Sequence, residues 1–313
     1  MTMSSSVETN VDNAVVLKGG TKKSKHPVAK LMHVFFKLGD KFFIKKAGKL
    51  ASNLWFKPRK FAASDSEIIV LNQAEQSSYC LGKDKVINYY RWGSSDETIL
   101  LVHGWEGRAS QFYQYVLSLI QAGYSVVAFD APGHGLSQGR DSDILEFHQI
   151  MTHLQDIFGQ FSALIAHSFG AICATYSINN GINTDKIITI STPSHFKGLV
   201  YKFQAILGLT DKVTNELCKN IEARFNHLGT NIWQEFSTYV NARNATTKAL
   251  IIHDKNDKEV PYEESVLIHD NWPLSKLILT EGLGHKRILK DSATIDEVVR
   301  FLANTQAKKT VLD

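Results

Sequence analysis

The stretch Ala163-Leu164-Ile165-Ala166-His167-Ser168-Phe169-Gly170-Ala171 determines the fold expected of the whole chain. Its apolar first half is typical of a buried strand, and the small residues after Ser168 favour the start of a helix. A serine between a strand and a helix lies in a sharp, strained turn, and the crossing backbone leaves room only for small neighbours. Ala166 and Gly170 occupy the two positions where size matters most. The stretch therefore predicts a strand, a strained serine and a helix in immediate succession.

This succession is typical of a nucleophile elbow, whose usual form is Gly-x-Ser-x-Gly. Here alanine stands in place of the first glycine, and alanine is the smallest replacement available. A serine hydroxyl is a weak nucleophile until a base takes its proton, and the base needs an acid to orient it. The chain should therefore supply an acid and then a histidine downstream of Ser168, each in a loop that follows a strand.

Strand-like and helix-like segments alternate on both sides of Ser168, which predicts an α/β fold with a mostly parallel sheet covered by helices on both faces. A hairpin over residues 78–92 precedes them, so about eight strands are expected. Residues 193–247 are too long for one crossover helix, and we interpret them as a helical lid. The other expected strands are 98–102, 125–129, 163–166, 186–190, 249–253 and 276–279, and the expected helices are 65–75, 109–122, 142–159, 169–179, 263–271 and 293–304.

The loops after the last two strands carry the acid and the histidine. His285 follows the final strand and has Gly284 before it, which favours it as the catalytic base. Asp257 lies inside the preceding turn and is the favoured acid. Asp254, at the strand end, is expected to brace the turn through backbone hydrogen bonds instead. Glu259 is a third candidate for the acid.

The negative charge of a tetrahedral intermediate needs backbone N–H donors. One is expected from Phe169, at the start of the helix after Ser168. The other is expected from Trp105, because the His103-Gly104-Trp105 loop follows an earlier buried strand. These two N–H groups are the predicted oxyanion hole.

From about residue 76 to residue 304 the chain resembles the serine hydrolases of the α/β-hydrolase fold. The motifs that contain Glu106 and Arg140 resemble those of the monoacylglycerol lipase and lysophospholipase branch of that family. A basic helix before the fold resembles a group of bacterial hydrolases. The motifs that carry the resemblance occur in the family's order, as His103-Gly104, Phe129-Asp130-Ala131-Pro132-Gly133-His134-Gly135-Leu136-Ser137, the elbow at Ser168, Asp257-x-x-Val260-Pro261 and Gly284-His285.

The resemblance and the ordered triad predict an enzyme that cleaves small carboxylic esters or thioesters through an acyl-enzyme. Ser168 would attack the acyl carbon, His285 would take its proton, and Asp257 would stabilise the imidazolium. Acyltransferases and peptidases use the same triad, so both stay open as alternatives. A non-catalytic binding protein with this fold is the alternative from another class, and the intact triad disfavours it.

Positive charge is concentrated at the N-terminus. Residues 1–60 hold thirteen Lys and Arg against three acidic residues, a net charge of +10, whereas the whole chain carries +4, so the remaining 253 residues carry −6. A basic segment before an acidic body does not indicate a nucleic-acid-binding fold, and we expect no nucleic-acid partner.

Residues 27–60 form a predicted basic, amphipathic helical extension. Leu31, Phe35, Leu38 and Phe42 share one helical face, and lysines fill most remaining positions. Glycines at positions 39 and 48 weaken the helix, so two shorter helices are an alternative. Two interpretations of residues 27–56 are open. The apolar face docks on the body of the protein, or it lies on an anionic membrane surface.

The remaining features concern location and cofactors. Residues 1–26 are predicted to be a disordered tail without a secretory signal, and residues 61–313 form the predicted hydrolase domain. The three cysteines include no Cys-x-x-Cys pair, which fits a reducing compartment. We therefore expect a cytoplasmic protein, at the inner membrane surface if the extension binds lipid. Histidine spacing indicates no metal site, and the triad needs no cofactor.

Overall fold

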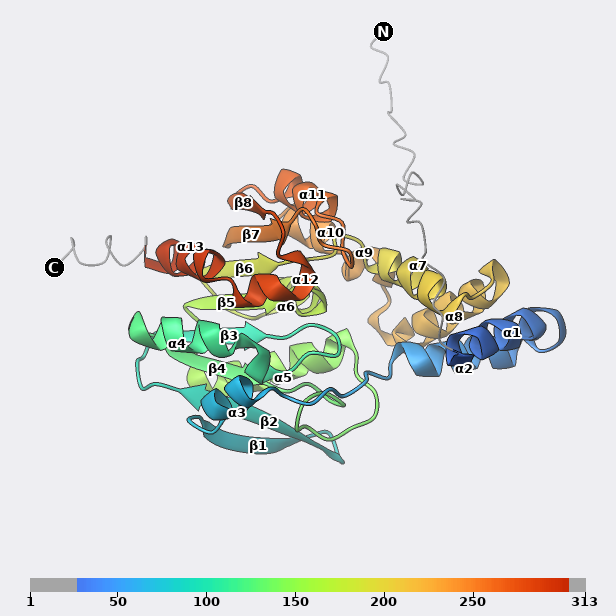
Figure 1. Ribbon diagram of the computed structural model, residues 1–313, viewed down its shortest axis with the longest axis horizontal. Coiled ribbons are helices and arrows are strands. Elements are labelled where there is room, and N and C mark those ends of the chain that lie inside the picture. Colours follow the sequence, from blue (N-terminus) through green and yellow to red (C-terminus); the bar gives the residue numbers. More distant parts are fainter. Residues whose placement is uncertain (1–26, 304–313) are drawn as a thin grey trace, which may run out of the picture.

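The computed structural model describes residues 27–303, and an eight-stranded sheet lies at its centre (Figure 1). The strand order is β1-β2-β4-β3-β5-β6-β7-β8. β2 pairs antiparallel with both β1 and β4, and every other neighbouring pair in this sheet is parallel. The mostly parallel α/β sheet predicted from the sequence is confirmed. The strands are β1 Glu75–Leu81, β2 Lys85–Trp92, β3 Thr98–Val102, β4 Ser125–Phe129, β5 Ala163–His167, β6 Lys186–Ile190, β7 Lys248–Asp254 and β8 Ser275–Thr280.

Side chains of the central strands alternate between two apolar cores, one on each face of the sheet. Leu100 and Val102 of β3 enter one core, and Ile99 and Leu101 enter the other, as the period of a strand requires. Helices α5, α6 and α11 cover the first face, and α3, α4 and α13 cover the second. Their bounds are α3 Asp65–Leu71, α4 Tyr113–Gln121, α5 Ile144–Phe158, α6 Phe169–Asn179, α11 Glu263–Asn271 and α13 Ser292–Ala303.

The expected helix over 65–75 is wrong at its C-terminal end. Helix α3 stops at Leu71, because the edge strand β1 already begins at Glu75. Glu67 is buried and accepts hydrogen bonds from Arg108 Nε (2.7 Å) and Ser110 Oγ (3.0 Å). These contacts fasten α3 to the chain just after the 103–107 loop.

A helical insertion separates β6 from β7, in the segment predicted as a lid. Its helices continue the first core outward, so that Val200, Leu217 and Phe236 are fully buried. Two short helices, α9 and α10, return the chain to the sheet. The insertion contains α7 Phe196–Leu207, α8 Asp211–Arg224, the 3₁₀ turn Asn226–Leu228, α9 Ile232–Glu235 and α10 Thr238–Ala242.

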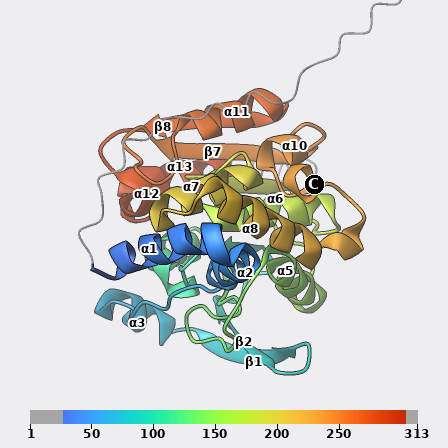
Figure 2. The same ribbon diagram turned by 90° about the vertical axis from the view of Figure 1, so that its right-hand side faces the viewer.

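The N-terminal extension forms two helices, α1 Pro27–Phe42 and α2 Ile44–Trp55. The break falls at Phe43, whose φ of −153° is not helical, and not at either glycine. Helix α2 packs along α8 of the insertion, and α1 touches both α7 and α8 (Figures 1 and 2). The extension therefore docks on the inserted helices. The predicted tail at 1–26 lies outside the described residues.

Residues after α2 tie the extension to the loops of the sheet. Arg59 forms a two-pronged ion pair with Glu106, with Nε–Oε1 at 2.6 Å and Nη2–Oε2 at 2.8 Å. Lys60 Nζ donates to the Ser137 carbonyl (2.8 Å). The connection reaches the 103–107 loop through Glu106, directly beside Trp105. Within residues 27–303, no helix combines the length and apolar character needed to cross a bilayer.

Gly48 offers a test of this docking. A Cβ placed on Gly48 would lie 2.4 Å from the Cβ of Glu216 on α8, so Gly48→Ala should push α2 away from the insertion. We expect faster cleavage within residues 27–60 in limited proteolysis, because local opening exposes the backbone.

Gly198→Ala is the matched control, since its Cβ would meet nothing closer than 3.6 Å in a regular helix. This control should leave proteolysis unchanged. Equal protection of the Gly48→Ala extension would contradict the α2–α8 contact.

Candidate active site

Ser168 occupies the strained turn that the sequence predicts. It links β5 directly to α6 and has φ 53° and ψ −121°, a conformation that costs about 1–3 kcal/mol for a residue with a side chain. The Ser168 N–H donates to the Ile190 carbonyl of β6 at 2.9 Å, which holds the turn against the sheet. The serine thus stands at the carboxyl edge of the central strands.

Close packing around the turn explains which neighbour must be glycine. A Cβ on Gly170 would lie 2.3 Å from the His103 carbonyl oxygen and 2.5 Å from that of Val102. Helix α6 could not approach β3 with any side chain there. Ala166, in contrast, is fully buried in the sheet with its methyl group accommodated. The alanine in place of the usual first glycine is therefore compatible with the elbow.

The structure brings Ser168, His285 and Asp257 together. His285 Nε2 lies 3.1 Å from Ser168 Oγ, and His285 Nδ1 lies 2.7 Å from Asp257 Oδ2. The carboxylate can only accept, so it fixes the proton of neutral His285 on Nδ1 and leaves Nε2 free to accept from the serine hydroxyl. This is the geometry a general base needs.

Asp257 is held as a buried anion. Its side chain is fully buried, and Oδ1 accepts from the N–H groups of Glu259 (2.7 Å) and Val260 (2.9 Å). The His253 ring nitrogen Nε2 lies 3.3 Å from Oδ2. Burial by itself would raise the pKa of Asp257, but hydrogen bonding from His253 and His285 holds it well below its usual range. The carboxylate is therefore charged at every pH at which the protein would work.

The two other acidic candidates have different positions. Asp254 accepts hydrogen bonds from the N–H groups of Leu283 (2.9 Å) and Gly284 (2.8 Å), and so braces the loop that carries His285. Glu259 Oε2 lies 3.9 Å from His285 Nε2, on the serine side of the ring. Only Asp257 contacts Nδ1, the nitrogen that an orienting acid must hold.

The loop with Trp105 lies against the elbow. A Cβ on Gly104 would be 3.1 Å from the Cβ of Ser168, so the two backbones are in contact. Among the described residues, the Trp105 N–H donates no hydrogen bond to a backbone carbonyl. Phe169 begins α6, and the first N–H groups of a helix have no acceptor inside it. Neither of the two N–H groups predicted as oxyanion donors has a backbone acceptor of its own among the described residues.

His103 fixes the shape of that loop. Its Nε2 accepts from the Ala131 N–H at 3.0 Å, which places the ring proton on Nδ1, and Nδ1 donates to the Gly104 carbonyl at 2.7 Å. Burial lowers the pKa of His103, so the ring stays neutral and keeps this tautomer. Asp130 braces the neighbouring loop by accepting from Ala109 N–H and Leu136 N–H.

Two family models match the chain over consecutive segments. The family described as "Serine aminopeptidase, S33" matches residues 93–235, and the family described as "TAP-like protein" matches residues 232–312. A non-heme chloroperoxidase from Burkholderia pyrrocinia is 32% identical over 113 residues, which cover 33% of this chain and 39% of that relative. The match therefore spans about two fifths of the relative's length.

Solved structures share the fold over most of the chain. An esterase from Pyrococcus furiosus superposes with a TM-score of 0.60 at 17% identity, covering 79% of this chain and 96% of that one. The alpha/beta hydrolase domain-containing protein 10 from mouse gives 0.57 at 19% identity, with 75% and 99% covered. This chain has the α/β-hydrolase fold.

A second Ser–His–acid group in this α/β-hydrolase is built differently. Ser194 Oγ contacts Glu264 Oε2 and also His195 Nδ1 (2.7 Å), and its N–H donates to the same carboxylate (2.7 Å). In a triad the histidine stands between the serine and the acid. Here the buried serine bonds to both, so the group fastens the start of the insertion to α11.

Among residues 27–303, no cluster of His, Cys, Asp and Glu has metal-binding spacing.

His167 is the site residue whose role the sequence did not reveal. Its ring is buried beside Ser168 and His285, and Nε2 donates to the backbone carbonyl of His285 at 2.9 Å. Burial, with the neighbouring His285 ring, lowers the pKa of His167 to about 3. The residue before Ser168 thereby holds His285 by its main chain. The dipeptide His167-Ser168 alone carries no signal for this contact.

His167 should make stability depend on pH in a defined direction. Its pKa is about 3 in the fold and about 6.5 when unfolded, so the unfolded chain binds an extra proton between those values. Stability is therefore lost as pH falls from about 6.5 toward 3, by up to about 1.4 kcal/mol per pH unit from this residue.

The substitution His167→Gln keeps an N–H donor but cannot titrate. Urea unfolding across this pH range should show a smaller loss of the free energy of unfolding in the variant than in the wild type. Parallel pH profiles for the two proteins would contradict a buried neutral His167.

Proposed function

We propose that this α/β-hydrolase cleaves carboxylic esters or thioesters by nucleophilic catalysis at Ser168. The observation that carries the proposal is the continuous hydrogen-bonded chain from Ser168 Oγ through His285 to the buried Asp257 carboxylate. The fold, the elbow and the structural similarity to the Pyrococcus furiosus esterase support a hydrolase of this kind. The carboxylate and the imidazole are already positioned, so little reorganisation is needed before attack.

In the first half of the proposed reaction, Ser168 Oγ bonds to the acyl carbon while His285 Nε2 takes the hydroxyl proton. Asp257 stabilises the resulting imidazolium, and the N–H groups of Trp105 and Phe169 bind the oxyanion. The tetrahedral intermediate then expels the alcohol or thiol, which receives its proton from His285. Water attacks the acyl-enzyme with His285 as base, and the acid and the free enzyme are released.

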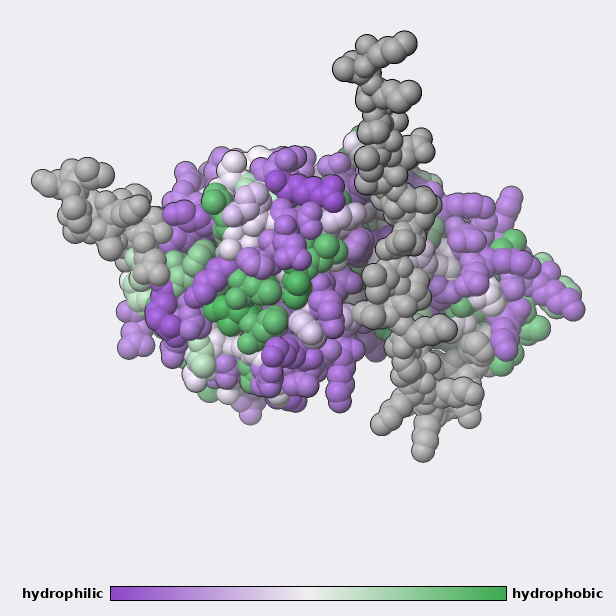
Figure 3. Space-filling model, turned by 90° about the horizontal axis from the view of Figure 1, so that it is seen from above, coloured by the Kyte–Doolittle hydropathy of each residue, from purple (hydrophilic) through white to green (hydrophobic). Residues whose placement is uncertain are grey.

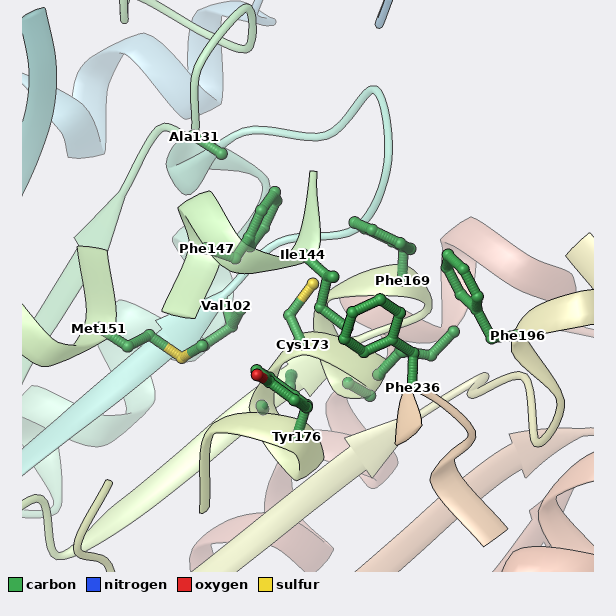
Figure 4. Close-up of a cluster of buried hydrophobic side chains, with 14 of the residues drawn as sticks. Val102, Ala131, Ile144, Phe147, Met151, Phe169, Cys173, Tyr176, Phe196 and Phe236 are labelled. Atoms are coloured by element: carbon green, nitrogen blue, oxygen red, sulfur yellow. The ribbon is translucent and has the colours of Figure 1, made fainter. Parts of the chain in front are cut away.

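The helical insertion is proposed to act as a lid. Lys202 of α7 has its Nζ 3.9 Å from Glu259 Oε2, and that oxygen is 3.9 Å from His285 Nε2, which supports a position of α7 above the base. Phe196, at the start of α7, shares an apolar cluster with Phe169, the residue after the nucleophile (Figure 4). Apolar side chains of the insertion and of the start of α6 would contact the acyl group.

Acyltransferase and peptidase activities would use the same acyl-enzyme with a different acceptor or donor. The family described as "Serine aminopeptidase, S33" makes amides the first alternative to test. Parallel assays on p-nitrophenyl esters, thioesters and aminoacyl anilides, with and without added alcohol acceptors, separate these reactions. Ester or thioester hydrolysis should exceed amide hydrolysis. A binding protein without turnover would leave every substrate intact.

Removing the nucleophile or the acid should abolish most of the rate. Ser168→Ala should lower kcat for an ester by about 10⁴- to 10⁶-fold, and Asp257→Asn by about 10⁴-fold, because the latter loses the required tautomer of His285. Circular dichroism should show an unchanged fold in both variants.

Glu259→Gln is the matched control for Asp257→Asn. It removes a carboxylate that also lies near His285 but contacts the other ring nitrogen, and we expect a change of less than about tenfold. An unchanged rate in Ser168→Ala would refute the mechanism. A larger loss in Glu259→Gln than in Asp257→Asn would reassign the acid.

A further inference from the structure

The outward face of α1 is apolar and has no partner among the described residues. Val34, Leu38 and Phe42 repeat at every fourth position, so they form one stripe along the helix. Their exposed fractions are 52%, 49% and 68%, and Phe35 beside them is also exposed. A contiguous exposed apolar stripe is typical of an interaction site, whereas ordinary protein surface carries its hydrophobic residues singly.

The opposite face of α1 is already occupied. Phe36 is fully buried, and Gly39 allows close approach to Ala47 of α2, because an added Cβ would lie 2.6 Å from the Ala47 side chain. The docking described above therefore uses one side of α1 only. The two interpretations of the extension are compatible, since the inner side packs on the protein while the outer stripe stays exposed.

Lysines border the exposed stripe. Lys37 and Lys41 lie on α1 next to Val34 and Leu38 in the helical projection, and Lys41 Nζ lies 5.4 Å from the centre of the Phe42 ring. Helix α2 also carries exposed lysines at positions 45, 46 and 49, on a side of that helix away from its contact with α1. Figure 3 shows hydrophobic residues set among hydrophilic ones at the end of the molecule that contains these helices. Aromatic and aliphatic side chains between lysines suit an interface between acyl chains and anionic headgroups.

We propose that the outer face of α1 binds an anionic lipid surface. The apolar stripe would enter the headgroup boundary, while Lys37 and Lys41 at its border contact lipid phosphates. A second copy of the chain suits this face less well, because a symmetric contact between two such stripes would bring lysines against lysines. The inference concerns binding alone and does not rest on the proposed esterase reaction.

This surface would also orient the rest of the molecule. Helix α1 is fixed to the insertion through α2 and α8, and Arg59 joins the same segment to Glu106 beside the predicted oxyanion loop. A bilayer under α1 would therefore lie at the end of the molecule where the inserted helices lie (Figure 2).

Vesicle co-sedimentation of the full chain tests the proposal. Wild type should bind phosphatidylcholine vesicles that contain phosphatidylglycerol and should bind pure phosphatidylcholine much less. Lys37→Gln with Lys41→Gln should weaken binding by about 30-fold, since each lysine near an anionic surface contributes roughly fivefold. Val34→Ser, Leu38→Ser and Phe42→Ser together should weaken it by more than about 100-fold.

Two matched control variants distinguish binding by this face from nonspecific adsorption of exposed apolar or basic side chains. Leu117→Ser, Ile157→Ser and Leu274→Ser together remove apolar side chains of similar exposure elsewhere, and Lys248→Gln with Lys276→Gln removes two exposed lysines. Both controls should bind like the wild type. Equal losses in the controls, or equal binding to neutral and anionic vesicles, would overturn the proposal. A wild-type dimer in light scattering that the stripe variant abolishes would assign the face to a second copy instead.

Discussion

Close packing of α6 against the end of β3 is the constraint on which the site depends. It forces Ser168 into a strained backbone conformation and leaves room for nothing larger than glycine at position 170. The strain is maintained because the central strand β5 leads into the turn and the Ile190 carbonyl of the neighbouring β6 accepts from the Ser168 N–H. A hydroxyl on a flexible loop could not keep its place beside the imidazole. The rigid sheet therefore supplies the orientation that the proposed chemistry requires.

Electrostatic preorganisation is the second contribution of the fold. Asp257 is buried, yet two backbone N–H groups and two histidine rings surround it, which offsets the cost of burying its charge. Asp254, the last residue of β7 and three residues before Asp257, holds the loop with His285 by accepting from its backbone N–H groups. His167 completes the arrangement from the nucleophile's own strand. Each group near the serine is thus held by partners in a neighbouring loop.

Much of this arrangement could be predicted from the sequence. The alternation of segments predicted the parallel sheet, and the motif order predicted which loops meet at its carboxyl edge. The sequence contains no comparable pattern for side-chain contacts between distant segments. Ser64 and Glu67 have the spacing of a helix cap, and Ser64 Oγ does donate to Glu67 (3.3 Å), but nothing in this spacing predicts that the other Glu67 oxygen pairs with the distant Arg108. Likewise, amphipathic periodicity shows that residues 27–56 have an apolar face, but not that α8 receives part of it.

Identification of the reacting serine tests the central claim most directly. The full chain would be treated with a fluorophosphonate probe, which bonds covalently to activated serine hydroxyls, and digested for peptide mass spectrometry. The account predicts one adduct, on Ser168, formed much more slowly in Asp257→Asn, where His285 loses its orienting anion. An adduct on Ser194 or another serine, or none under conditions that label a known serine esterase, would contradict it.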